Sequence, residues 1–314
     1  MDFLLSDVFW IGLMAAAVRL ATPILLASLG EMLAERAGVL NIGVEGMMLI
    51  GALGGFLGSQ GTGSPWVGVL AGMVAGLLLA LLFAYLTITL AADQIVAGIM
   101  VNLLAIGVTG FGHRVIFGMT TVIPSAPPLV DWRIPLLADI PVLGPVLFQQ
   151  NPLVYLGFVL VVACWFMLFR TTWGLKIRAV GEHPLAADSL GVSVHRVRYA
   201  AVLACGGMAG IGGSFLSLGQ LNMFVEEMSA GRGFIALAVV IFARWHPVGV
   251  LGVSILFGAA EALQFRLQAQ AAEEIPFQFL AILPYLLTVV ALVSIVRRSV
   301  QPAALTHPYI KERH

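Results

Sequence analysis

The chain has 314 residues, of which 60% are hydrophobic and only 10% are charged, and its mean hydropathy is +1.00. A water-soluble protein of this length cannot bury so much apolar surface, so the composition excludes one and predicts an integral membrane protein. Basic and acidic residues number 16 each, so the positions of the charges, rather than their sum, carry information. Cys164 and Cys205 each lie within an apolar run, without a Cys or His at metal-ligand spacing, and are interpreted as packing residues.

Nine apolar runs are candidate membrane-spanning helices, since a helix needs about 20 apolar residues to cross a bilayer. They are 8–29, 38–58, 65–90, 94–117, 152–169, 199–220, 232–245, 248–264 and 276–296. The run 232–245 is short, and a half-spanning or tilted element is an alternative for it. We therefore expect an all-α bundle of about nine transmembrane helices, in which residues 1–314 form one transmembrane domain.

Glycine pairs four residues apart recur in these runs, at Gly51/Gly55, Gly72/Gly76 and Gly206/Gly210. This spacing lets two helix backbones approach closely. We interpret the pairs as packing contacts within the bundle. Arg19 lies midway along the first run and needs an acidic partner in the membrane; Glu45 is the first candidate and Glu261 the second.

Two glycine-rich stretches contain the first candidate pathway residues. Asn41 and Glu45 are four residues apart, which predicts that they share one face of a helix. Glycine-interrupted spans at corresponding places in two halves of a transporter point towards its binding site, and the second-half counterpart contains Gly231 and Gly233. The alternative is that Asn41 and Glu45 lie near the cytoplasmic end, within reach of water.

A polar stripe on the run 94–117 supplies further candidates. At helical spacing it consists of five residues on one face: Gln94, Gly98, Asn102, Ala105 and Thr109. Amides donate and accept hydrogen bonds, which suits the hydroxyls of a ribose or the edge of a base. We predict that Gly98 and Asn102 line a substrate pathway. The alternative for Asn102 is a structural hydrogen bond between helices.

The distribution of basic residues predicts the orientation of the chain. Eleven of the 16 Lys and Arg residues fall on one side if the polar loop 170–198 and the tail 297–314 are cytoplasmic. The N-terminus is then outside and the C-terminus inside. The loop 118–150 is then outside, and its six prolines exclude a long helix there.

Within the loop 170–198, Pro184 is typical of a helix start and Gly191 of a helix end. Between them Leu185, Ala186, Ser189 and Leu190 share one face, and Asp188 points elsewhere. A two-turn helix is marginal by itself in water and needs a partner. We interpret it as a coupling helix that enters a groove on a cytosolic motor subunit; the alternative is a solvated loop with an incidental helical turn.

Four stretches of the chain resemble a known family. RAVGEHPLAADSLGVSV is similar to the cytoplasmic segment of permease subunits in ATP-binding-cassette (ABC) importers for ribose, nucleosides and branched-chain amino acids. LAERAGVLNIGVEGMMLIGA (33–52), ADQIVAGIMVNLLAIGVTGF (92–111) and GRGFIALAVVIFARWHPVG (231–249) resemble the nucleoside and simple-sugar branch of that class. The resemblance runs from about residue 20 to residue 298.

The resemblance implies a set of partners and a location. They are a cytosolic ABC ATPase carrying ATP and Mg²⁺, a second homologous permease subunit, an extracytoplasmic substrate-binding protein and the bacterial cytoplasmic membrane. It implies a nucleoside as substrate, then ribose or another simple sugar, then a branched-chain amino acid. The residues that it implies for coupling to the ATPase are Gly181, Glu182, Pro184, Ala186, Ala187, Leu190 and Gly191.

Catalytic motifs are absent from the sequence. It has no GxxxxGK[ST] phosphate-binding loop, HExxH, GxSxG or CxxC, so we expect a non-catalytic subunit with no cofactor or metal of its own and no nucleic-acid partner. An ion- or proton-coupled secondary transporter is the alternative function, with Glu45 and Glu261 as its only candidate carboxylates. A membrane enzyme ranks third.

Overall fold

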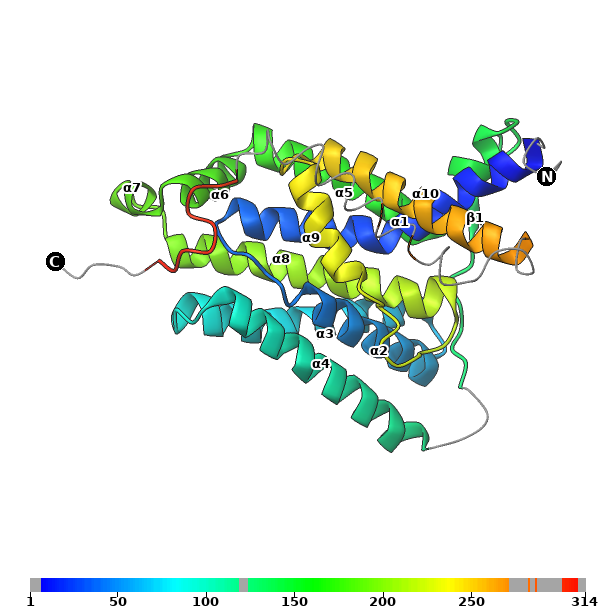
Figure 1. The fold of residues 1–314 in the computed structure, drawn as a ribbon, viewed down its shortest axis with the longest axis horizontal. Coiled ribbons are helices and arrows are strands. Elements are labelled where there is room, and N and C mark those ends of the chain that lie inside the picture. Colours follow the sequence, from blue (N-terminus) through cyan, green and yellow to red (C-terminus); the bar gives the residue numbers. More distant parts are fainter. Residues whose placement is uncertain (1–6, 119–123, 271–281, 283–285, 287–300, 310–314) are drawn as a thin grey trace.

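The computed structural model describes residues 7–118, 124–270, 282, 286 and 301–309, and most of them are helical. The long helices run side by side along the long axis of the molecule (Figure 1). The elements are α1 (Asp7–Arg36), α2 (Val44–Thr62), α3 (Pro65–Ala84), α4 (Gln94–Phe117), β1 (Trp132–Arg133), β2 (Gln149–Gln150), α5 (Pro152–Arg170), α6 (Thr172–Glu182), α7 (Pro184–Ser189), α8 (Val194–Phe215), α9 (Arg232–Phe242) and α10 (Pro247–Gln270), with π-helical turns η2 (Tyr85–Thr89), η3 (Gly144–Phe148) and η4 (Leu216–Gln220).

The all-helical, multi-pass architecture expected from composition is confirmed. Six helical segments of the described residues are long and apolar enough to cross a membrane: Val8–Arg36, Pro65–Thr89, Gln94–Phe117, Pro152–Arg170, Val194–Gln220 and Pro247–Ala269. Each overlaps a predicted span. The predicted span 276–296 lies outside the described residues.

The second predicted span begins later than expected. Residues 37–43 form an irregular turn, with Gly38 in the left-handed region (φ 84°), and α2 begins only at Val44. Asn41 therefore precedes the helix, and the prediction that Asn41 and Glu45 share a helical face is wrong. The reason is that side chains of other helices hold the turn, as Gln94 accepts a hydrogen bond from the Leu40 amide at 2.8 Å.

Close glycine contacts join α2, α3 and α8, as the four-residue spacing predicted. A Cβ added at Gly51 would lie 2.5 Å from the Gly210 backbone, and one at Gly76 would lie 2.2 Å from the Gly206 carbonyl oxygen. No residue larger than glycine fits these positions without separating the helices. The three helices therefore form the tightly packed centre of the molecule.

The short run predicted at 232–245 is the eleven-residue helix α9, about 16 Å long. This is well under the roughly 30 Å of a bilayer core, which fits the half-spanning alternative. The segment 221–231 that leads into it contains three non-glycine residues with positive φ, namely Asn222, Glu227 and Ala230. Figure 1 shows α9 starting midway along the bundle and crossing the longer helices.

The proline-rich stretch contains no long helix in its described part, 124–150, in agreement with prediction. It forms a two-stranded antiparallel ribbon in which Trp132 pairs with Gln150. Its Ala126 and Leu129 amides donate to carbonyl oxygens of Asn222 and Leu218, near the end of α8. Helix α7 precedes the start of α8, so these two regions lie at opposite ends of the bundle (Figure 1).

Candidate functional site

A cavity of about 280 Å³ lies where α2, α4 and α9 meet. Its walls include three of the predicted pathway residues, Glu45, Asn102 and Gly231, together with Glu227 and Phe234. These residues come from segments far apart in the sequence. The fold therefore brings the glycine-rich stretches of the two halves together with the polar stripe of α4.

Glu45 is tied to the start of α9. Its carboxylate oxygens accept hydrogen bonds from the amides of Gly231 at 2.8 Å and Gly233 at 2.6 Å. A carboxylate at a helix N-terminus meets unpaired N–H groups and the positive end of the helix dipole. Gly233 allows this approach, because a Cβ there would lie 2.5 Å from the Glu45 Cα.

Asn102 holds the turn before α2. Its Oδ1 accepts a hydrogen bond from the Gly46 amide at 2.8 Å, and its Nδ2 donates to the Ile42 carbonyl at 3.0 Å. The five stripe residues are all buried on one side of α4, as predicted. Gly98 packs against the same turn, with Ile42 2.8 Å from the position of a Cβ. The amide of Asn102 thus serves the structural role named as its alternative, while its side chain also lines the cavity.

Asn41 lies apart from the cavity, fully buried. Its backbone amide donates to the Glu31 carboxylate at 2.8 Å, and its side-chain Nδ2 contacts the sulfur atoms of Met47 and Cys205. Glu31 also accepts a hydrogen bond from the Cys205 thiol at 3.2 Å. Sequence analysis did not select Glu31, because it lies in a mostly apolar helical run and no local pattern indicates its contact with Asn41.

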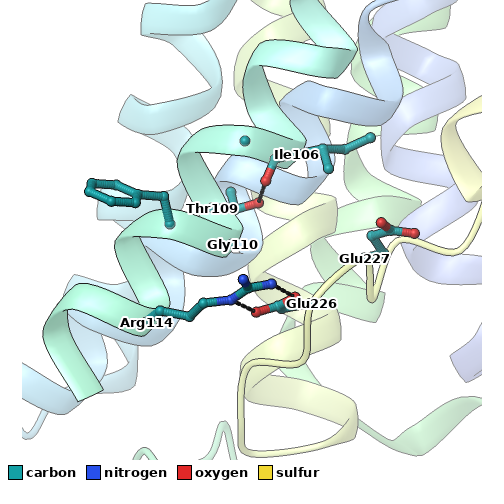
Figure 2. Close-up of a pocket in the computed structure, with 8 residues that line it drawn as sticks. Ile106, Thr109, Gly110, Arg114, Glu226 and Glu227 are labelled. Carbon is teal, nitrogen blue, oxygen red and sulfur yellow. Dashed lines mark hydrogen bonds and ion pairs between the residues drawn. The ribbon is translucent and has the colours of Figure 1, made fainter. Parts of the chain in front are cut away.

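A second cavity, of about 330 Å³, continues along α4 towards the end that carries residues 124–150. It shares Ile106 and Glu227 with the first cavity and includes Arg114 and Glu226. Figure 2 shows the Arg114 guanidinium paired with the Glu226 carboxylate through two hydrogen bonds of 2.8 Å. These bonds lower the pKa of Glu226, so it remains ionised at neutral pH.

Glu227 extends beside this ion pair without joining it (Figure 2). Within the part of the chain that the structure describes, its carboxylate has no hydrogen-bond partner, and its backbone is left-handed with φ 57°. A polar group free to bind at the wall shared by two cavities is a candidate ligand contact. Sequence reasoning missed it because residues 221–231 have neither helical periodicity nor a motif.

Both acidic partners proposed for Arg19 were wrong. Arg19 pairs with Asp131 at 3.2 Å, and both side chains are over 40% exposed. Glu261 instead forms a largely buried ion pair with Arg232 at the start of α9. Glu45 is hydrogen-bonded to the start of α9, so both carboxylates that the sequence offered as candidates for a proton- or ion-coupled transporter have structural partners.

At the opposite end of the bundle, α7 lies between Pro184 and Gly191, as these two residues predicted. Pro184 is its first residue, and Gly191 follows it in the left-handed region with φ 84°. Leu185, Ala186, Ser189 and Leu190 are exposed, and Leu190 is 84% exposed. This surface is apolar and has no partner among the described residues.

Ala187 does not belong to that exposed surface. It is 4% exposed and packs in the same core cluster as Val180 and Val194. Gly181 is also internal, since a Cβ there would lie 2.0 Å from the Arg36 carbonyl oxygen. These two predicted coupling residues therefore face the chain's own core. Glu182 and Pro184 are at the junction of α6 and α7.

No group of three or more His, Cys, Asp or Glu side chains that could hold a metal ion occurs among the described residues. The two cavities instead offer carboxylate, guanidinium and amide groups next to apolar side chains. Such groups can hydrogen-bond a polar solute but supply no nucleophile activated by a base.

Comparisons with known proteins agree over nearly the whole chain. A family model described as "Branched-chain amino acid transport system / permease component" matches residues 13–295. The guanosine ABC transporter permease protein NupQ of Bacillus subtilis is 39% identical over 307 residues, covering 94% of this chain and 95% of that protein. No solved structure matches this chain.

Two further relatives cover most of their own length. The putative glucose ABC transporter permease protein TsgC13 of Haloferax volcanii is 43% identical over 265 residues, or 83% of this chain and 79% of that protein. The nucleoside ABC transporter permease protein NupC of Lactococcus lactis is 35% identical over 301 residues, or 93% and 95%.

Proposed function

Because this chain belongs to the family of permease components of branched-chain amino acid transport systems, we propose that it forms the membrane route for a nucleoside. As a member of that family it is a non-catalytic permease subunit of an ABC importer. Ribose or another simple sugar is the alternative solute, and it is favoured by the similarity to a putative glucose permease.

The observation that carries the substrate route is the pair of adjoining cavities on α4. They share Ile106 and Glu227, and each is near 300 Å³, at the lower end of the range of small-molecule sites. Amide and carboxylate groups can bind the hydroxyls of a sugar, and apolar groups such as Phe234 can contact a base. In this proposal Glu45, Asn102, Gly231 and Glu227 line the route, while Gly98 and Gly233 permit the close helix contacts that shape it. Asn41 supports the turn from behind.

The proposed partners follow from the exposed surfaces. The outer side of α4 leaves apolar residues such as Met100 and Leu103 uncovered, and we assign this side to a second permease subunit and to lipid. The exposed face of α7 docks on a cytosolic ATPase that binds ATP and Mg²⁺. An extracytoplasmic binding protein delivers the solute at the end that carries residues 124–150. The permease itself lies in the bacterial cytoplasmic membrane.

The substrate class is tested by uptake in cells that express the complete importer. We expect uptake of a labelled nucleoside that is inhibited by unlabelled nucleosides, resists a protonophore and stops when ATP is depleted. Inhibition by glucose or ribose but by no nucleoside would transfer the assignment to sugars. Loss of uptake with the protonophore while ATP persists would contradict an ATP-driven importer.

The coupling role is tested by Ala186→Arg, with Ser193→Arg as the matched control beyond Gly191. Ala186 is exposed on α7, so the long charged side chain leaves the chain's own core undisturbed but blocks an apolar contact. We expect copurification of the ATPase and stimulated ATP hydrolysis to fall in Ala186→Arg and to persist in Ser193→Arg. Normal copurification and hydrolysis in Ala186→Arg would show that α7 is only a solvated turn. The buried Ala187 is unsuitable for this test, because Ala187→Arg would disturb the core.

A further inference from the structure

The segment 301–309 crosses the end of the bundle that carries α6 and α7, and it is called the strap below. Its Ala304 amide donates to the Gly181 carbonyl at 2.8 Å, and its Ala303 amide lies 3.4 Å from the Glu182 carboxylate. Both acceptors belong to the last turn of α6, immediately before α7. The red segment in Figure 1 runs beside α6 and the start of α8.

Arg198 fastens the strap to α1 and α8. This side chain is 1% exposed, and its guanidinium donates to the Ala37 carbonyl at 3.2 Å and the His307 carbonyl at 3.0 Å. A buried guanidinium has to satisfy its donors inside the protein. The carbonyls of Ala37 and His307 meet that need for Nε and Nη1, whereas Nη2 has no hydrogen-bond partner among the described residues. The strap therefore meets the end of α1 and the start of α8 at this guanidinium.

Side chains of the strap complete the core beneath α7. Leu305 and Tyr309 are buried in the same cluster as Ala187 and Val194. The ring of Tyr309 packs edge-on against His195, with 5.5 Å between ring centroids, and its hydroxyl lies next to the Asp188 carboxylate of α7. Burial and the neighbouring Asp188 carboxylate raise the pKa of the Tyr309 hydroxyl, so it remains a donor at neutral pH.

Helix α7 needs such support because six residues cannot hold a helix in water. Its contacts with the described chain include the buried Ala187 on one side and, next to it, Asp188 beside Tyr309. The opposite face carries the exposed Leu185 and Leu190. Anything that fixes Ala187 and Asp188 therefore also fixes the direction in which the exposed face points.

We propose that the strap is a positioning element for α7, and that Tyr309 orients the ATPase-docking face through Asp188. This inference rests on the proposed coupling role of α7. Glu182, which the family resemblance assigns to coupling, contributes here by holding the strap. Motion of the docked α7 would then be transmitted through the strap and Arg198 to the end of α1.

The test compares Tyr309→Phe, which removes only the hydroxyl, with His307→Ala, whose side chain is exposed and whose carbonyl remains. ATPase affinity and substrate-stimulated hydrolysis are measured on the purified permease in detergent, after its melting temperature and yield are checked. For Tyr309→Phe we expect ATPase binding to weaken about fivefold to tenfold, the effect of one lost hydrogen bond. For His307→Ala we expect no change.

A double-mutant cycle separates positioning from general stability. Asp188→Asn keeps an acceptor and should bind the ATPase almost normally, whereas Asp188→Ala should resemble Tyr309→Phe. If the two side chains act together, Tyr309→Phe combined with Asp188→Ala should be no weaker than the worse single variant. Additive losses, or loss of melting temperature without loss of binding, would contradict the inference.

Ala186→Arg distinguishes the two proposals. If it abolishes docking while Tyr309→Phe docks normally, α7 couples but the strap does not orient it, and the inference fails alone. If Ala186→Arg also docks normally, the coupling role itself fails and the inference fails with it.

Discussion

Single polar side chains hold the places where the helices of this bundle are interrupted. Backbone groups inside a membrane cannot hydrogen-bond to water and must be paired within the protein. Gln94 accepts from the Leu40 amide, Glu31 from the Asn41 amide, and Asn102 from the Gly46 amide. Polar residues are costly to place in a membrane, and here they lie next to irregular backbone whose N–H groups they pair. Asn102 therefore combines a structural role with a place on the cavity wall.

The double role of Asn102 gives the first prediction. Asn102→Leu leaves the Gly46 amide and the Ile42 carbonyl unpaired in a buried turn, each at a cost of about 1–3 kcal/mol. We expect normal membrane insertion, a melting temperature in detergent lower by several degrees, and reduced uptake. Leu78→Ala is the control, since Leu78 is also 64% exposed and lies on α3, away from both cavities. Unchanged stability together with unchanged uptake would remove Asn102 from both roles.

At the scale of elements, the packing of α9 against α2 gives Gly231 and Gly233 different roles, although the sequence alone does not distinguish them. A Cβ at Gly231 meets no atom within 4 Å, although its φ of 82° is left-handed, whereas a Cβ at Gly233 would lie 2.5 Å from the Glu45 Cα. Gly231→Ala should therefore cost only about 1–2 kcal/mol of backbone strain. Gly233→Ala combines overpacking with loss of the Glu45 hydrogen bonds, or about 3 kcal/mol or more.

Thermal unfolding of both variants in detergent measures this difference. We expect the larger fall in melting temperature, and the larger loss of uptake, for Gly233→Ala. Equal falls would mean that α9 does not sit against Glu45 as described.

Local signals predicted the helices whose ends are set locally. The α4 prediction matches at both ends, and Asp93 caps its start by accepting from the Ile95 and Val96 amides. In the same way, α5 begins at Pro152, and Asn151 caps it by accepting from the Leu153 amide. The start of α2 could not be predicted, because side chains 50 or more residues away hold the preceding turn. Tertiary contacts also decided the partners of Arg19 and Glu261.

At the scale of the whole molecule, the sequence located most of the candidate site but not its geometry. Glu45, Asn102 and Gly231 were selected individually, and the fold places them in one cavity. Glu226, Glu227 and the strap were missed, because their positions depend on how distant segments pack. Burial also changes the interpretation of one charged residue. Arg198 was counted among the cations of the polar loop, yet it is only 1% exposed.

Orientation across the membrane is the last prediction. Basic residues at the α6–α7 end include the exposed Arg170, Lys176 and Arg196, whereas the segment 124–150 has only Arg133. The positive-inside rule therefore places α7 in the cytoplasm and residues 124–150 outside.

Cysteines at the exposed Ser125 and Ser189 test this orientation, in a background with Cys164→Ala and Cys205→Ser. Both native cysteines are buried, and serine at position 205 keeps a donor for Glu31. A membrane-impermeant maleimide should label position 125 in intact cells and position 189 only after permeabilisation. Labelling of position 189 in intact cells would reverse the orientation, and it would leave the face of α7 on the wrong side of the membrane for an ATPase.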